Sequence, residues 1–124
     1  RILGQLGSDP RIGIVAPARS VLGSEFLGPN RGAVEVLSRT GGRPFDPDAL
    51  WFPSGSMFWS RTEVLTPLAD LRLAAADFGV ETGAVDGTLA HAVERYLGVL
   101  AATQDLAVIE VPDMDRLLAA RQRG

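Results

Sequence analysis

A run of apolar residues at helical spacing constrains the fold of this chain most strongly. Between positions 87 and 101 the large apolar side chains recur three or four residues apart, at Leu89, Val93, Tyr96, Leu97 and Leu100. Asp86 stands just before this stretch, and Asp is a favoured residue at the start of a helix. The pattern therefore predicts a helix over 87–101 with one face in a hydrophobic core.

Short apolar runs on either side of this helix predict strands. Residues 12–16 are apolar and end at a proline, and residues 106–111 hold five apolar residues and one Glu. Residues 55–59 lead from a Gly-Ser pair into Met57, Phe58 and Trp59, which suit a buried strand. Because strands alternate with helices, the predicted class is α/β, with a small mixed sheet flanked by helices.

Weaker signals predict the remaining elements. Asn30 can cap a helix over residues 31–40, and the glycine pair that follows would end it. Residues 17–29 hold Pro, Gly and Ser at intervals, which favours a loop. Pro112-Asp113 is typical of a helix start, so a last helix is predicted over 114–122.

Composition limits the kind of protein this can be. The chain has 124 residues, of which 46% are hydrophobic, enough for one domain with a real core. It has no Cys, which excludes disulfides and thiolate chemistry, and no apolar run approaches the ~18 residues that span a bilayer. The net charge of −3 argues against nucleic acid as a partner. Because residue 1 is Arg in what reads as a helix end, we expect residues 1–124 to be a single domain and a fragment of a larger protein.

Two strings of residues carry a family resemblance. Positions 55–59 read Gly-Ser-Met-Phe-Trp, and positions 86–95 read Asp-Gly-Thr-Leu-Ala-His-Ala-Val-Glu-Arg. Together they resemble the rhamnan synthesis protein F family, a group of glycosyltransferase-like proteins in bacterial polysaccharide assembly, over roughly residues 10–101. Since no early βαβ nucleotide-binding unit is evident, the resemblance implies the acceptor-side half of a GT-A-type glycosyltransferase domain.

Asp86 is the candidate catalytic base. In an inverting transfer, a carboxylate must come within about 3 Å of the acceptor hydroxyl to take its proton. In glycosyltransferases of this type, the catalytic base is often an acidic residue that enters a helix after a Gly-containing strand. Asp86 is similarly placed. The same Asp could instead only cap its helix, a role worth ~1 kcal/mol, and the sequence leaves both roles open.

The resemblance also implies a set of substrate-binding residues at the start of the 87–101 helix. His91 and Arg95 are four residues apart and so share a helix face. The resemblance includes Glu94 as well. It implies that Arg95 contacts a diphosphate or holds Glu81. The simpler alternatives are a hydrogen-bonded structural role for His91, the only His, and a solvated helix face for Glu94 and Arg95.

Further substrate contacts are expected from the 55–59 string. Gly55 and Ser56 could bring the backbone close to an acceptor sugar, since Gly permits close approach. Trp59 or Trp51 could stack on a sugar ring. For Met57 and Phe58, filling of the core is the preferred interpretation.

Metal binding is not predicted for this chain. Asp46-Pro47-Asp48 and Asp113-Met114-Asp115 have the Asp-x-Asp form that such enzymes use for a nucleotide-bound metal, but strings this short match by chance. The first lies in a turn-like segment and the second opens a helix. No cofactor is therefore assigned, although a complete enzyme could use a divalent metal.

These observations predict part of a glycosyltransferase that moves a rhamnose-like sugar from a nucleotide sugar to a growing cell-surface polysaccharide. The partners would be the nucleotide sugar and the glycan acceptor, with membrane-associated proteins nearby and self-association through exposed apolar edges. The expected location is the cytoplasm, at the inner face of the plasma membrane. The alternative is a non-catalytic module that binds a glycan or a protein, with Trp51 and Trp59 as an exposed patch.

Overall fold

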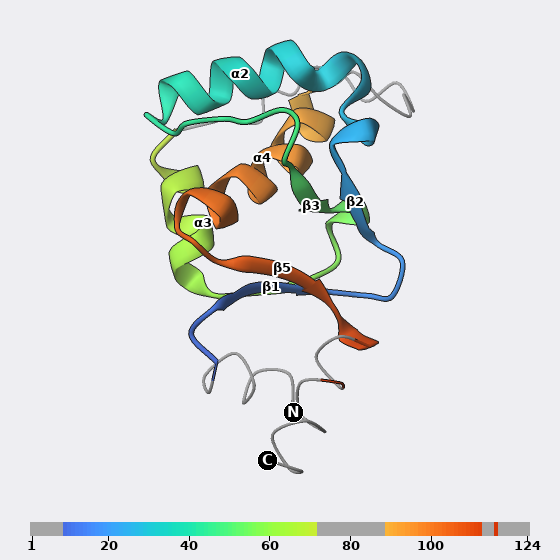
Figure 1. Ribbon diagram of the computed structural model, residues 1–124. Coiled ribbons are helices and arrows are strands. Elements are labelled where there is room, and N and C mark those ends of the chain that lie inside the picture. Colours follow the sequence, from blue (N-terminus) through green and yellow to red (C-terminus); the bar gives the residue numbers. More distant parts are fainter. Residues whose placement is uncertain (1–8, 72–88, 113–115, 117–124) are drawn as a thin grey trace.

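The structure is a computed structural model, and it describes residues 9–71, 89–112 and 116 (Figure 1). The predicted last helix over 114–122 has only one residue within these ranges. The helix end expected at the start of the sequence lies outside them. The elements below are those of the described part of the chain.

Strand β1 (Ile12–Ala16) is the centre of the main sheet. It runs antiparallel to β4 (Trp59–Ser60) and parallel to β5 (Ala107–Glu110). The strand order is β4-β1-β5, so the small mixed sheet expected from the sequence is present. All five residues of β1 are buried, as a strand with neighbours on both edges and packing on both faces should be.

Helix α4 (Leu89–Thr103) is the largest element and forms the core with the sheet. In Figure 1 it lies between the β1–β5 strands and helix α2 (Arg31–Thr40), with α3 (Thr62–Ala69) packed beside it. The predicted apolar stripe is confirmed: three of its members are buried and two are half-buried against the core, namely Tyr96, Leu97, Leu100, Leu89 and Val93.

A second, two-stranded sheet was not predicted. It pairs β2 (Val21–Gly23) with β3 (Trp51–Pro53) in antiparallel register. The loop predicted over 17–29 is therefore wrong in part, because this segment also contains the 3-10 turns η1 (Ser24–Phe26) and η2 (Gly28–Asn30). Of the residues that favoured a loop, Ser24, Gly28 and Pro29 lie in short turns between β2 and α2.

Asn30 stands at the predicted helix start but acts differently from a usual cap. Its backbone is already helical, with φ −85° and ψ −9°, whereas a capping side chain normally extends from a β-region backbone. The amide of Asn30, only 1% exposed, instead donates to the Leu27 carbonyl at 2.8 Å. It therefore ties η2 together rather than capping α2.

The buried strand predicted over residues 55–59 is wrong. Residues 54–56 form a 3-10 turn, η3 (Ser54–Ser56), and pairing with β1 begins only at Trp59. Met57 is 72% exposed, so it does not fill the core, while Phe58 is half-buried against it. From Met57 to Ser60 exposed and half-buried side chains alternate, because one face of this segment packs on the core and the other faces solvent.

Candidate functional site

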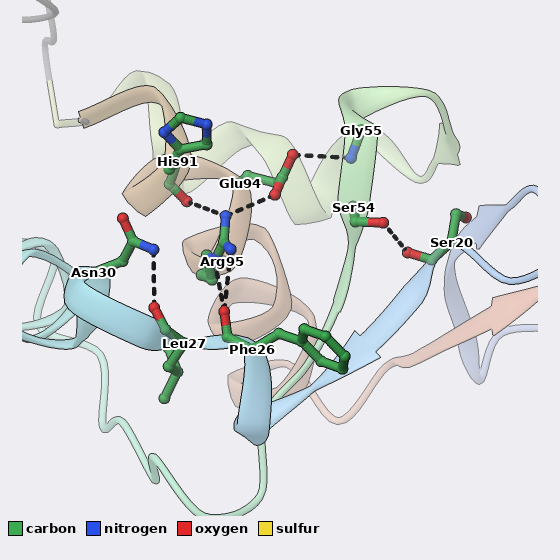
Figure 2. A network of polar contacts seen from close by, with 9 residues as sticks. All are labelled: Ser20, Phe26, Leu27, Asn30, Ser54, Gly55, His91, Glu94 and Arg95. Atoms are coloured by element: carbon green, nitrogen blue, oxygen red, sulfur yellow. Dashed lines mark hydrogen bonds and ion pairs between the residues drawn. The ribbon is translucent and has the colours of Figure 1, made fainter. Parts of the chain in front are cut away.

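A hydrogen-bonded network joins the two strings that carry the family resemblance (Figure 2). The backbone N–H of Gly55 donates to Oε2 of Glu94 at 2.9 Å. The other carboxylate oxygen, Oε1, accepts from Nη1 of Arg95 at 2.8 Å. One glutamate of α4 thus holds the η3 turn with one oxygen and a neighbouring cation with the other.

Arg95 extends this network to a third segment. Its Nε and Nη2 donate to the Phe26 carbonyl at 3.4 and 3.0 Å, and its Nη1 also donates to the His91 carbonyl at 3.3 Å. The guanidinium carbon lies 4.8 Å from the ring centre of Phe52, within cation–π distance. A buried cation needs several such partners, because burial without them costs several kcal/mol.

Burial rules out the solvated helix face considered for Glu94 and Arg95. The two side chains are 14% and 9% exposed, so the ion pair is held largely out of water. Their contacts with the Gly55 N–H and the Phe26 carbonyl suit residues that position the site. The contact of Arg95 with a diphosphate and that of Glu94 with a substrate remain predictions.

The η3 turn is held from a second side by β2. The backbone N–H and the hydroxyl of Ser54 both donate to the Ser20 carbonyl, at 2.7 and 2.6 Å (Figure 2). Gly55 is exposed, and a Cβ added to it would meet open space, so its positive φ is what calls for glycine here. Sequence reasoning missed Ser20, Ser54 and the Phe26 carbonyl, because contacts made through backbone carbonyls leave no pattern in the sequence.

The other predicted site residues are spread over several places. His91 is half-buried on the first turn of α4, on the same helix face as Arg95, as its spacing predicts. Trp59 lies on edge strand β4 opposite Val15 and is 42% exposed. Ser56 closes η3. The candidate base Asp86 and the candidate contact Glu81 lie outside the described residues, so the structure does not place them against this network.

The potential metal ligands in the described ranges are the side chains of His, Asp and Glu. Among residues 9–71, 89–112 and 116, no three His, Asp or Glu side chains gather as a metal site. Oδ1 of Asp46 accepts from the backbone N–H of Asp48 at 2.9 Å, an Asx turn that gives the first Asp-x-Asp string a local structural role. The second string, 113–115, lies outside the described residues.

The geometry so far defines a small α/β domain in which a buried Glu–Arg pair fixes a glycine turn beside the start of a long helix. Comparison with protein families then matches residues 1–106 to the family described as rhamnan synthesis protein F. The chain belongs to this family, as the two strings indicated.

The chain also has curated relatives. The chain is 46% identical over 100 residues to the protein WxcX of Xanthomonas campestris pv. campestris strain B100, described as uncharacterized. It is equally similar to the WxcX protein of strain ATCC 33913 of that pathovar. The aligned region covers 79% of this chain but only 14% of these relatives, so the chain spans about one-seventh of their length. No solved structure matches it.

Proposed function

We propose that this chain is part of a glycosyltransferase that moves a rhamnose-like sugar from a nucleotide sugar to a growing bacterial cell-surface polysaccharide. Membership of the rhamnan synthesis protein F family supports the polysaccharide role. The observation that carries the proposal further is the Glu94–Gly55 hydrogen bond, which draws the two family strings together at one end of α4. A small mixed sheet with helices over it is consistent with the acceptor-side half of a GT-A-type domain.

In this proposal Asp86 is the general base. In the sequence it precedes α4 by a few residues, and the first turns of that helix carry His91 and Glu94. It would take the proton of the acceptor hydroxyl as the sugar leaves its diphosphate. Glu94 and Arg95 would act on the η3 turn, holding Gly55 and Ser56 where the acceptor passes.

Replacement of the proposed base tests this mechanism. Asp86→Asn keeps the shape of the side chain and removes its basicity, so sugar transfer should fall by about 10²–10⁴-fold. Transfer is measured with the longest gene product that carries this sequence, from a labelled nucleotide sugar to polysaccharide. Asp70→Asn, at the exposed end of α3, is the matched control and should leave transfer unchanged. Unchanged transfer in Asp86→Asn, with unchanged melting, would exclude the base role.

The acceptor-side assignment makes a separate prediction about the donor. This chain alone should not bind deoxythymidine or uridine diphosphate sugars in a manganese-dependent way, because the donor half would lie elsewhere. Calorimetric titration with and without manganese measures this directly. Metal-dependent binding would move the donor site into this chain and would direct mutagenesis to the Asp-x-Asp strings.

A non-catalytic glycan- or protein-binding module is the second candidate function. It is favoured by large apolar side chains that face solvent: Trp51, Met57 and Trp59 are 60%, 72% and 42% exposed. Such residues commonly mark interaction surfaces when they gather. If Asp86→Asn abolishes sugar transfer, the enzyme is supported and the non-catalytic module is rejected.

The proposed place of action is the cytoplasm, at the inner face of the plasma membrane, with membrane-associated partners. Across the described residues, the structure contains no helix with the length and apolar character needed to cross a bilayer. The proposal also includes a homo-oligomer formed through exposed apolar edges.

A further inference from the structure

A cavity of about 440 Å³ lies where helix α2 ends. It is lined by residues of the last turns of the helix and of the segment that follows: Glu35, Ser38, Arg39, Arg43, Pro44 and Phe45. We call it the Arg43 cavity. None of its residues belongs to the network around Glu94, so the candidate functional site does not explain its polar groups.

Arg43 is a half-buried cation with few partners. A guanidinium has five N–H donors, and among the described residues the side chain of Arg43 makes one hydrogen bond, from Nη1 to the Thr103 hydroxyl at 3.4 Å. Arg39, in the last turn of α2, is exposed. No carboxylate in the described ranges forms an ion pair with either arginine. Two positive charges thus line this cavity without a counter-ion from the described part of the chain.

A buried hydroxyl in the same cavity also lacks a partner. Ser38 is only 1% exposed, and within the described residues its Oγ has no hydrogen-bond partner. Such groups are uncommon in proteins, because burial of a polar atom without a hydrogen bond costs free energy. The Tyr96 hydroxyl, which is likewise buried and without a described partner, lies beside the end of α2: a Cβ added to Gly41 would lie 2.5 Å from it. Unsatisfied donors therefore gather at this end of the helix.

The negative groups near the cavity do not outweigh the two arginines. The end of a helix carries roughly half a negative charge, and the carbonyls of residues 37–39 already accept backbone N–H groups of the segment that follows. Glu35 is the one acidic residue in the lining, and Arg31 pairs with it at 3.5 Å. The charge balance of the cavity is therefore positive.

Further acidic residues lie in an adjoining cavity. This cavity, of about 470 Å³, shares Pro44 and Phe45 with the Arg43 cavity and is lined by Asp46 and Asp105. Because like charges repel, an anionic group that enters here is directed away from these carboxylates and toward Arg39 and Arg43. The two cavities together would orient a ligand that carries an anion at one end.

We propose that the Arg43 cavity binds a phosphate group. Each guanidinium offers a planar pair of N–H donors that matches two phosphate oxygens, and the Ser38 hydroxyl would donate to a further oxygen. A phosphate dianion balances both arginine charges, whereas a carboxylate brings one charge and two oxygens to the same donors. This binding needs neither a metal ion nor Asp86, so it goes beyond the proposed function and does not rest on it.

Calorimetric titration of the chain with inorganic phosphate provides a direct test. The titration is done without manganese, at about pH 8, where phosphate is a dianion, and at constant ionic strength. Phosphate should give saturable heat, and chloride at the same ionic strength should give none. A second titration with glucose 1-phosphate distinguishes the sources of the phosphate. Tighter binding of the sugar phosphate would show that the ligand extends past Phe45, and equal binding would show that the phosphate alone is recognised; both results support the proposal.

Matched variants locate the site. Arg43→Gln and Arg39→Gln should each weaken phosphate binding by about tenfold or more, because each removes a charge-assisted contact. Arg19→Gln is the control: Arg19 is exposed, lines neither cavity, and its replacement changes the net charge by the same amount. Ser38→Ala should weaken binding about threefold while the melting temperature stays equal or rises, because its hydroxyl has no described partner to lose. A residue with only a structural role would not give this split.

Three outcomes would overturn the proposal. The first is the absence of saturable binding of both phosphate and glucose 1-phosphate to the folded chain. The second is undiminished binding in Arg39→Gln and Ser38→Ala, which test the site even if Arg43→Gln does not fold. The third is an equal loss of binding in Arg19→Gln, which would mean that net charge alone attracts the anion. Loss of transfer in Asp86→Asn without phosphate binding here would refute the cavity and keep the proposed function, so the two failures are distinguishable.

Discussion

Glu94 and Arg95 show how two adjacent residues can hold three segments of a chain. Glu94 holds the η3 turn, Arg95 holds η1 through the Phe26 carbonyl, and each neutralises the other. Since both are mostly buried, the pair is more than a surface ion pair, for which the typical contribution is only ~0–1 kcal/mol.

Removal of the glutamate should therefore be costly. Glu94→Ala leaves the Gly55 N–H without its acceptor and Arg95 without its counter-ion, and we expect a loss of about 1–3 kcal/mol in the free energy of unfolding. Glu35→Ala is the matched control, because Glu35 forms an exposed i,i+4 pair with Arg31 at 3.5 Å and should cost only about 0.3–0.5 kcal/mol. Denaturant unfolding measures both. Equal effects would mean that the network contributes little to stability.

Tyr96 makes a second residue-level prediction, in alkali. Burial is the main cause that raises the pKa of Tyr96 above its usual value of 10.0, and the positive charge of Arg43 partly opposes it. The pKa of Tyr96 is therefore higher in the folded chain than in the unfolded chain. The stability that the neutral phenol contributes is complete below about pH 10 and is lost as the pH rises through the folded-state pKa. Tyr96 is the only Tyr, so tyrosinate absorbance of the folded chain should titrate above that value.

Replacement with phenylalanine checks the same argument. Within the described residues the Tyr96 hydroxyl is buried and has no hydrogen-bond partner. Tyr96→Phe should therefore leave stability at neutral pH unchanged or increase it by about 1 kcal/mol, and should remove the alkaline decline. Urea unfolding at pH 7 and in alkali measures both effects. A marked loss of stability at pH 7 would show that the hydroxyl has a partner in the rest of the chain.

Helix α4 is the element that the sequence predicts best. Its apolar spacing correctly indicated a long helix, its buried face and the shared face of His91 and Arg95, although the helix ends at Thr103 and not at residue 101. The partners of that face could not be predicted in the same way. Phe26 is distant in sequence and contributes only a carbonyl oxygen, which every residue has.

The segment around Trp59 shows the opposite case. Its apolar character suggested a buried strand, yet Met57 and Trp59 face solvent and only Trp59–Ser60 pair with β1. Hydrophobicity does not distinguish a core residue from an exposed binding residue, since both are apolar. Trp51, which the sequence analysis placed with Trp59 in an exposed patch, is 60% exposed in the structure.

The contact of α4 with β3 makes a prediction at the level of elements. Gly98 faces β3 so closely that an added Cβ would overlap the carbonyl oxygen of Trp51, a backbone atom that cannot rotate away. Gly98→Ala should therefore destabilise the fold by about 1–3 kcal/mol, despite the better helix propensity of Ala. Gly32→Ala, in α2 with open space around it, is the control and should be neutral or stabilising by up to about 1 kcal/mol. Thermal unfolding compares them; if the two variants melt alike, α4 can move away from β3 at little cost.

At the scale of the whole molecule, the sheet order could not be deduced from the sequence. The alternation of strands and helices predicted a mixed sheet, but it does not indicate which of the three strands lies in the middle. The chosen order puts the most buried strand in the middle and the shortest, exposed one at an edge. Burial of the side chains selects this arrangement, and burial is a property of the assembled fold.

Amide hydrogen exchange should distinguish the central strand β1 from the edge strand β4. We expect the amides of β1 and of the buried half of α4 to exchange most slowly, since their opening disrupts the core. The amides of β4 should exchange faster, because this strand has two residues and a single neighbour. Exchange measured by mass spectrometry or NMR tests this. Equal rates in β1 and β4 would contradict the central place of β1.

The parallel pairing of β1 with β5 also has a consequence for the order in which the fold is completed. Ile14 and Val15 lie near one end of the sequence, and their partners Val108 and Ile109 lie near the other. During synthesis on the ribosome, β1 emerges long before β5 and must wait for its partner, because contacts between distant segments form slowly. Until then one edge of the most apolar strand has no neighbour, so this interval is when a nascent chain most needs the protection of a chaperone.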